Sequence, residues 1–232
     1  MNKFKLKEFF EKVDYDWTKD KEVLQEICRV TKTRARPTMP KDILVEGMEQ
    51  PFFLKACADY FKPKKILEIG TGRGTGSYAM GLTTEVEKIV TLDIIPFQQK
   101  QNTAIGFQPA VASNADLFRL VKDEKAKAKI EFLERNDFSL STDFDMAFID
   151  GNHDDKEIIK KDFDICEAVL RNGGVIIWDD YNFSEFVVKD VVDEIAKKED
   201  LKITLVFQKG HLFGDTKEDK NGMIIMSKTE IF

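Results

Sequence analysis

An apolar run that ends in an acid and four alternating glycines constrains the fold of this chain most. The run covers residues 64–69, and the glycines are Gly70, Gly72, Gly74 and Gly76. Glycine accepts positive φ and has no Cβ, so a ligand can approach the main chain closely. Alternating glycines after an apolar strand are typical of a nucleotide-binding turn that leads into a helix. We therefore expect a ligand above the carboxyl end of this strand.

The spacing of the glycines narrows the class of nucleotide. A dinucleotide fingerprint, Gly-x-Gly-x-x-Gly/Ala, would need its third small residue at Thr75 when counted from Gly70. Counted from Gly72, it would need that residue at Ser77. Neither frame matches, so the dinucleotide interpretation requires an irregular fingerprint. An ordinary glycine-rich turn is the other alternative.

Residues 68–74 follow a different pattern, Glu-x-Gly-x-Gly-x-Gly. In this pattern the chain resembles the class I S-adenosylmethionine-dependent methyltransferases, whose turn holds a sulfonium amino acid and meets no pyrophosphate. The resemblance implies S-adenosylmethionine as the cofactor. It also implies an α/β fold with a doubly wound, mostly parallel seven-stranded sheet, the Rossmann-like methyltransferase fold. The cofactor turn would consist of Glu68, Gly70, Thr71, Gly72 and Gly74.

Length, composition and charge exclude other classes of protein. The chain has 232 residues, of which 42% are apolar, and it can bury one sizeable core. We expect a single domain over residues 1–232, with a helical cap at 1–62 and a Rossmann-like core at 63–232. The formal net charge is −6, and no basic cluster is interleaved with aromatics, which argues against a nucleic-acid partner.

Cysteine usage and the apolar runs bear on the compartment. Cys28, Cys57 and Cys166 are far apart and fall in apolar helical patterns, as expected of core residues in a reducing compartment. No apolar run approaches the ~20 residues that span a bilayer, and the N-terminus lacks the apolar stretch of a signal peptide. We therefore expect a cytoplasmic protein without a membrane partner. A homo-oligomer is compatible with the sequence, which carries no pattern that decides the oligomeric state.

The first 62 residues are expected to be helical and to lie outside the main sheet. Apolar spacing predicts three helices, at residues 4–13, 23–30 and 52–61. Pro37 and Pro40 interrupt the pattern before the third helix. The segment at 45–50 resembles the one that small-molecule O-methyltransferases place over the cofactor, and a plain loop is the alternative.

The rest of the chain alternates between apolar runs and amphipathic segments, as in a parallel α/β sheet. Further strands are expected at residues 88–93, 129–133, 144–149, 175–178, 201–207 and 223–226, and the resemblance makes the last one antiparallel. Further helices are expected at residues 77–82 and 115–127, in a segment that ends at 172–174, and around 188–195.

Asp93 ends the second predicted strand, 23 residues beyond Gly70. A nucleotide-binding α/β fold places a carboxylate here to accept the ribose hydroxyls, and we favour this role over a cap of the turn before Pro96. After the third strand, the family commonly has a Gly-Asp-Ser-like segment that touches the adenine. This chain has no glycine there, so either Asn136 or Asp137 could take the place of the acid.

Three acids follow the fourth and fifth predicted strands. Asp150 comes after residues 144–149, and Asp179 and Asp180 come after 175–178. Because parallel strands present their carboxyl ends on one edge of the sheet, the three carboxylates should converge beside the cofactor. Carboxylates so close repel one another unless a positive charge lies among them. A hard divalent cation with oxygen ligands, Mg²⁺ above all, would relieve that repulsion.

Residues 148–153 and 173–181 resemble the metal-dependent small-molecule O-methyltransferases, the macrocin O-methyltransferase-like enzymes more closely than the catechol-type ones. The resemblance implies that Asp150, Asp179 and Asp180 ligate the metal, that Asp150 also lies against the cofactor, and that the acceptor is a small molecule. The macrocin-like pattern is Asp-Gly-Asp, with the second acid a candidate base. This chain departs from it with Asn152.

His153 is the candidate catalytic base. It is one of two histidines, and it follows Asp150 on a loop that faces the same edge of the sheet. An imidazole titrates near neutrality and could accept the proton of a phenol or an alcohol. The alternative is a histidine that orients Asp150 or caps the next helix. The catechol-type enzymes use a nearby lysine, and Lys156 is displaced from that position.

Other functions stay open on the sequence alone. They are a metal-independent methyltransferase with another acceptor, a nicotinamide-dependent oxidoreductase and a non-catalytic cofactor-binding protein. The glycine spacing disfavours the oxidoreductase. Methylation of nucleobase amines would predict an Asn/Asp-Pro-Pro-Tyr/Phe motif where this chain has Asp-Gly-Asn-His.

Overall fold

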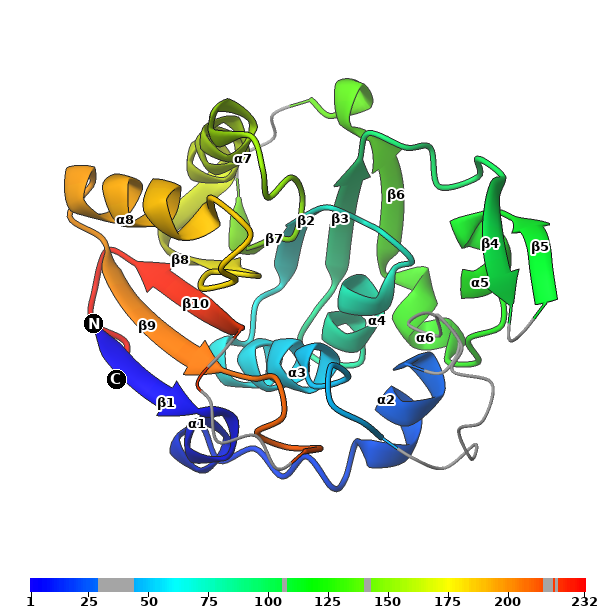
Figure 1. Cartoon of the computed structure of the whole chain (residues 1–232), viewed down its shortest axis with the longest axis horizontal. Helices are drawn as coiled ribbons and strands as arrows, with labels where there is room; N and C mark the ends of the chain where they lie inside the picture. The colour runs from blue at the N-terminus through cyan, green and yellow to red at the C-terminus, as the bar shows by residue number, and fades with distance from the viewer. Residues whose placement is uncertain (29–43, 106–107, 140–142, 215–218, 220) are drawn as a thin grey trace.

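The computed structural model describes residues 1–28, 44–105, 108–139, 143–214, 219 and 221–232 (Figure 1). Its main sheet has eight strands in the order β1-β9-β10-β8-β7-β2-β3-β6. The strands are β1 (Asn2–Lys5), β2 (Lys65–Ile69), β3 (Lys88–Asp93), β6 (Ile130–Glu134), β7 (Phe144–Ile149), β8 (Leu170–Trp178), β9 (Lys202–Phe207) and β10 (Gly222–Ser227). Strand β10 runs antiparallel to β8 and β9, and the other pairs are parallel. The predicted α/β fold with a mostly parallel sheet is confirmed.

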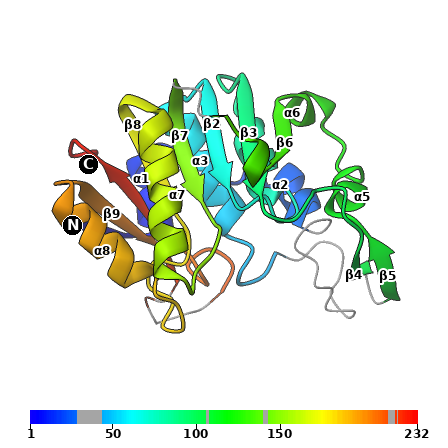
Figure 2. The same cartoon turned by 90° about the horizontal axis from the view of Figure 1, so that it is seen from above.

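Helices cover both faces of this sheet, as the doubly wound prediction requires. Figure 2 shows α7 (Lys156–Val169) and α8 (Val188–Lys198) on one face. The helices of the other face include α1 (Leu6–Lys12), α2 (Lys21–Ile27), α3 (Gln50–Phe61) and α4 (Thr75–Gly81). Side chains alternate along β2, so Ile66 packs in the core with the second group of helices and Leu67 packs under α7 and α8.

The N-terminal segment is not purely helical, and the sheet has eight strands where seven were expected. Residues 2–5 form β1, which pairs in parallel with β9 at the edge of the sheet. Phe4, assigned to a helix from its spacing, lies on this strand. Helix α1 begins only at Leu6, because Glu8 accepts a hydrogen bond from the backbone N–H of Lys5 and so caps the helix there. Pro37, Pro40 and residues 29–30 lie outside the described residues.

Two other segments differ from the sequence prediction. The helix expected at 115–127 is two short helices, α5 (Asn114–Phe118) and α6 (Glu124–Ala128). The second starts anew because the side chain of Asp123 accepts a hydrogen bond from the backbone N–H of Ala126 at 2.9 Å. A separate hairpin of β4 (Gln101–Ile105) and β5 (Gln108–Ala112), which sequence analysis missed, precedes them.

Strand β8 is longer at its start than predicted. Residues 172–174 lie within β8 and do not end the preceding helix, because α7 already stops at Val169. Gly173 has φ +85° and takes up the irregularity in the strand, where the pairing with β7 shifts register between Phe144 and Met146. Within the described ranges, no helix combines the length and apolar character needed to cross a lipid bilayer.

Candidate active site

A cavity of about 840 Å³ lies at the carboxyl ends of the central strands. The turn after β2, the end of β3 and the loops after β7 and β8 contribute to its wall. Strand β2 lies between β3 and β7, so the chain crosses to opposite sides of β2 at this point. Such a reversal of strand order is where open α/β sheets bind ligands.

The glycine turn forms the floor of this cavity. Gly70, Gly72 and Gly74 all have positive φ, at +96°, +49° and +78°. A Cβ on Gly70 would overlap the carbonyl group of Asp150, so glycine lets the turn after β2 pack directly on the loop after β7. Gly74 immediately precedes α4 as its N-cap residue, with the left-handed φ already given. The strand, turn and helix start predicted from the sequence are present.

Glu68 lies beneath the turn and supports it. Its buried carboxylate accepts hydrogen bonds from the Ser77 hydroxyl and, at 2.5 Å, from the Thr91 hydroxyl. The Thr91 and Thr71 hydroxyls are also hydrogen bonded, at 2.7 Å. Burial raises the pKa of Glu68 to about 7, and the two hydroxyl donors oppose this rise. Glu68 therefore joins β2, β3 and α4 behind the predicted cofactor turn.

Asp93 stands at the end of β3 and lines the cavity. Its Oδ2 accepts a hydrogen bond from the backbone N–H of Gly72 at 3.0 Å, and its Oδ1 accepts one from Ile95 at 3.0 Å. The carboxylate thus braces two turns, and each oxygen keeps a second lone pair for a ligand hydroxyl. Asp137 and Asn136 lie in the short 3₁₀ helix η2 (Arg135–Asp137) after β6, and the adenine contact predicted for this segment stays a prediction.

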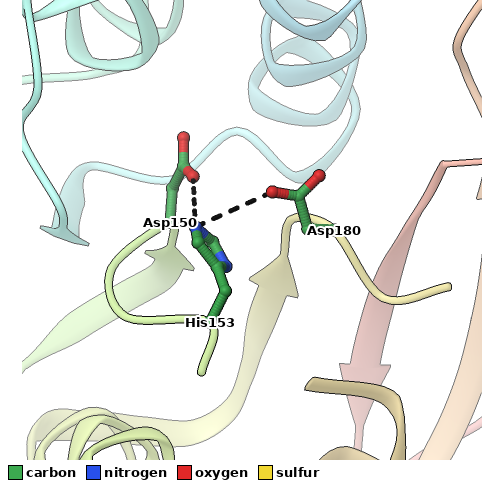
Figure 3. A group of neighbouring side chains, drawn as sticks. All are labelled: Asp150, His153 and Asp180. Atoms are coloured by element: carbon green, nitrogen blue, oxygen red, sulfur yellow. Dashed lines mark ion pairs between the residues drawn. The ribbon is translucent and has the colours of Figure 1, made fainter. Parts of the chain in front are cut away.

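Asp150, His153 and Asp180 converge above the ends of β7 and β8 (Figure 3). His153 Nε2 lies 3.7 Å from Asp150 Oδ1 and 3.7 Å from Asp180 Oδ2. The imidazole stacks on the ring of Phe186 at 4.8 Å between centroids. Burial lowers the pKa of His153, against the opposing charges of Asp179 and Asp154. Lowering of this pKa favours the neutral imidazole, which can accept a proton.

Asp179 is buried, and its carboxylate is held by side-chain amides. Gln208 Nε2 donates a hydrogen bond to its Oδ1 at 3.1 Å, and Gln50 Nε2 donates a short one to its Oδ2. The same Gln50 nitrogen donates to Asp150 Oδ2 at 3.0 Å. Of the three predicted metal ligands, Asp150 and Asp180 therefore lie around His153, while Asp179 contacts the two glutamines.

Residues 67–181 match a family model described as a methyltransferase domain. The chain carries a methyltransferase domain. The matched range begins on β2 and ends just after β8, so it contains the glycine turn, Asp93 and the three acids. The class I methyltransferase prediction made from the Glu-x-Gly-x-Gly-x-Gly pattern is confirmed.

Solved structures of similar fold support the same architecture for this methyltransferase domain. The O-methyltransferase TomG from Streptomyces achromogenes, in complex with SAM, has a TM-score of 0.60 and 18% identity over 90% of each chain. An O-methyltransferase from Bacillus cereus, in complex with SAH, has a TM-score of 0.57 and 20% identity over 88% of this chain and 90% of that one. The SAH-bound methyltransferase PaMTH1 from Podospora anserina has a TM-score of 0.59 and 17% identity over 90% of this chain and 88% of that one. No curated protein gives a match to this chain.

The residues of the methyltransferase domain fit both the cofactor and the divalent cation that its sequence implies. For the cofactor, the fit is the glycine cradle that a Cβ at Gly70 would block, with Asp93 beside it. For a hard cation, it is the pair of carboxylates of Asp150 and Asp180, each of which directs one oxygen toward Nε2 of His153. Asn152, where the macrocin-like pattern has an acid, accepts backbone hydrogen bonds from Asp154 at 3.0 Å and Asp155 at 2.7 Å, and so shapes the loop before α7.

Sequence reasoning missed four residues of this site. Gln50 lies in the segment noted at 45–50, so its position was signalled although its partners were not. Gln208 follows β9 and carries no motif. Arg135 lines the cavity and forms an ion pair with Asp162, a fully buried residue of α7. Burial raises the pKa of Asp162, and the Arg135 guanidinium opposes this rise.

Proposed function

We propose that this domain transfers the methyl group of S-adenosylmethionine to an oxygen atom of a small molecule, at a site that also holds a divalent cation. The observation that carries the proposal is the convergence of two carboxylates and an imidazole, one of which, Asp150, lines the cavity that contains the glycine turn. Similar folds described as O-methyltransferases, including one with SAM bound, support the choice of oxygen as the acceptor atom.

The glycine turn and Asp93 would bind the cofactor. The backbone at Gly70 offers close approach, and the Asp93 carboxylate, which lies beside the turn, would accept the ribose hydroxyls. When bound, S-adenosylmethionine supplies an electrophilic methyl group on a sulfonium, and the thioether that remains after methyl transfer is a good leaving group. The contribution of the chain is alignment, because the floor and walls of the cavity fix the cofactor relative to the acid cluster.

Asp150 and Asp180 would hold the cation, with Asp179 as the third proposed ligand. The two oxygens of Asp179 accept amide hydrogen bonds, and an ionised carboxylate has further lone pairs for a metal. When bound, a divalent cation lowers the pKa of an acceptor hydroxyl and orients its oxygen. His153 would accept the hydroxyl proton at Nε2, while the oxygen forms its bond to carbon and the sulfonium bond breaks with its electron pair on sulfur.

The test combines cofactor binding with turnover. We expect S-adenosylhomocysteine to bind in calorimetry, and a screen of phenols, catechols and sugar hydroxyls to give methyl transfer that Mg²⁺ stimulates and a chelator abolishes. Asp180→Ala should abolish the stimulated turnover and leave cofactor affinity within about twofold, because the cofactor is bound from β2 and β3. Turnover that survives exhaustive chelation would assign the acids a structural role and the chain a metal-independent reaction.

A further inference from the structure

We propose that Gln50 is a positioning residue for the acid cluster, whose amide holds the carboxylates of Asp150 and Asp179 in the arrangement that binds the cation. The inference rests on the proposed function, since it concerns how the same site is kept in shape. It adds a residue from the N-terminal segment to a site whose acids follow β7 and β8.

A single nitrogen atom connects the two acids. Gln50 Nε2 lies 3.0 Å from Asp150 Oδ2, and it also donates a short hydrogen bond to Asp179 Oδ2. A primary amide carries two hydrogens on that nitrogen, one for each carboxylate. Asp150 and Asp179 follow neighbouring parallel strands, and because both accept a hydrogen bond from the same nitrogen, their like charges lie close enough to repel. The neutral amide offsets the repulsion without cancelling the negative charge that a cation needs.

Burial makes this contact stronger than a surface hydrogen bond would be. Gln50 is 8% exposed and Asp179 is 7% exposed, so water competes little for either group. Hydrogen bonds to a charged group in such surroundings contribute more than neutral pairs, and removal of the donor leaves a buried carboxylate undersatisfied. Loss of the Gln50 amide should therefore change the positions of both carboxylates.

The backbone at Gln50 is fixed by its neighbour. Glu49 is buried and accepts hydrogen bonds from the backbone N–H groups of Gly210 at 2.8 Å and Gly47 at 2.6 Å. Gln208, two residues before Gly210, donates to Asp179 from the other side. The start of α3 and the segment after β9 thus close a ring of hydrogen bonds around Asp179. Gln50 is the member of this ring that reaches Asp150 as well.

Groups that orient metal ligands typically change metal affinity by about 10–100-fold when they are removed. The experiment measures the affinity of the full chain for free Mn²⁺, by electron paramagnetic resonance, with the affinity for S-adenosylhomocysteine as a second readout. Gln50→Met keeps the length of the side chain and removes the amide. We expect it to weaken Mn²⁺ binding about tenfold or more, with cofactor affinity within about threefold of the parent.

Two matched variants separate positioning from general loss of structure. Gln208→Met removes the amide that donates to Asp179 alone, and it should weaken Mn²⁺ binding less than Gln50→Met. Gln99→Met alters an exposed glutamine far along the chain from the acids and should leave both affinities unchanged. Gln50→Glu places a third carboxylate against the other two, so it should lower the melting temperature in chelator and recover stability when Mn²⁺ is added.

The outcomes distinguish this inference from the proposed function. If the parent chain binds no Mn²⁺, the proposed cation site is wrong. If the parent binds Mn²⁺ and Gln50→Met binds it equally well, the cation site stands and the positioning role of Gln50 is wrong. Should Gln50→Met fail to fold, the melting temperature of Gln50→Glu decides between the two roles. If Mn²⁺ restores this melting temperature, the positioning role stands. If Mn²⁺ does not restore it, the contact of Gln50 with the acids is purely structural.

Discussion

At the scale of single residues, Gly70 and Gly47 offer a matched pair. Both have a positive φ, +96° and +94°, but a Cβ at Gly70 would overlap the carbonyl of Asp150 while one at Gly47 would meet nothing within 4 Å. Gly47→Ala should cost about 1–2 kcal/mol, the penalty of left-handed backbone alone. Gly70→Ala should cost clearly more and should abolish cofactor binding. Urea unfolding and calorimetry measure the two effects, and equal destabilisation of the two variants would contradict the close approach of the turn to the β7 loop.

Asp93 carries the second prediction at this scale. Its carboxylate braces the turn through Gly72 and faces the cavity. Asp93→Ala should weaken binding of S-adenosylhomocysteine at least tenfold, about 1.4 kcal/mol, because it removes the acceptor for the ribose hydroxyls. Asp93→Asn keeps one acceptor oxygen and should have a smaller effect. Unchanged affinity of Asp93→Ala in calorimetry would exclude the ribose contact.

Which site residues the sequence could predict depends on how far away their partners lie. Gly70 and Asp93 follow strands in a motif with fixed spacing, so both could be assigned from local pattern. Gln50 is tied to acids 100 and 129 positions later in the chain, and a glutamine at the start of a helix has many other uses. Its role depends on tertiary structure, which no local spacing encodes.

At the scale of elements, Glu68 couples three of them and makes their packing depend on pH. It lies on β2 and accepts hydrogen bonds from Ser77 on α4 and Thr91 on β3. Burial raises its pKa to about 7 from the ordinary glutamate value of 4.5, so the folded state holds the proton more tightly than the unfolded state. Its contribution to stability is full below about pH 4.5 and is lost as pH rises through about 7.

Glu68→Gln should remove this dependence. The variant keeps an acceptor oxygen for the hydroxyls and has no charge to bury, so it should gain stability over the parent as pH rises, by on the order of 3 kcal/mol at about pH 8. Urea unfolding at about pH 5 and about pH 8 measures the difference between the two proteins. Glu87→Gln, at an exposed side chain, is the control and should show no such trend. Parallel pH profiles for the parent and Glu68→Gln would mean that Glu68 titrates normally.

The burial of an element and the position of its partners in the sequence explain which elements could be predicted. Strands β2, β3 and β7 are buried on both faces over most of their length, so each appears in the sequence as a run that is mostly apolar. Strand β1 has four residues, two of them lysines, and it is ordered by pairing with β9 some two hundred residues later. Short edge strands depend on such partners more than on their own propensity. The sequence between β4 and β5 does contain a hairpin signal, Gly106, which the prediction from apolar runs did not use.

At the scale of the whole molecule, the N-terminal segment and the sheet share one core. Leu6, Phe9 and Ile27 pack in the same apolar cluster as Ile66 of β2 and Val206 of β9. The described part of the segment predicted as a helical cap therefore packs into the core of the sheet. A chain whose core is shared in this way should unfold as one cooperative unit, and the single domain expected from the sequence stays a prediction that such an experiment can test.

The two tryptophans can test this cooperativity. Trp17 lies in the N-terminal segment against Phe52, and Trp178 ends β8 in the core on the opposite face of the sheet. Variants that keep one tryptophan each, Trp178→Phe and Trp17→Phe, report on the two regions separately by fluorescence during urea unfolding. If the chain is one cooperative unit, the Trp17 and Trp178 signals should show the same unfolding transition. The slope of the unfolding free energy against urea concentration should then correspond to unfolding of the entire chain.

Phe9→Ala makes the test stringent. Phe9 is fully buried and packs on Phe53 with ring centroids 5.1 Å apart, so its loss should cost about 3–5 kcal/mol. If the core is continuous, this substitution in the N-terminal segment lowers the unfolding midpoint of both signals by the same amount. A shift of the Trp17 signal alone would mean that residues 1–62 unfold independently. The positions that Glu49 and Gln50 take up at the active site would then depend on a local equilibrium of the N-terminal segment, and no longer on the stability of the fold as a whole.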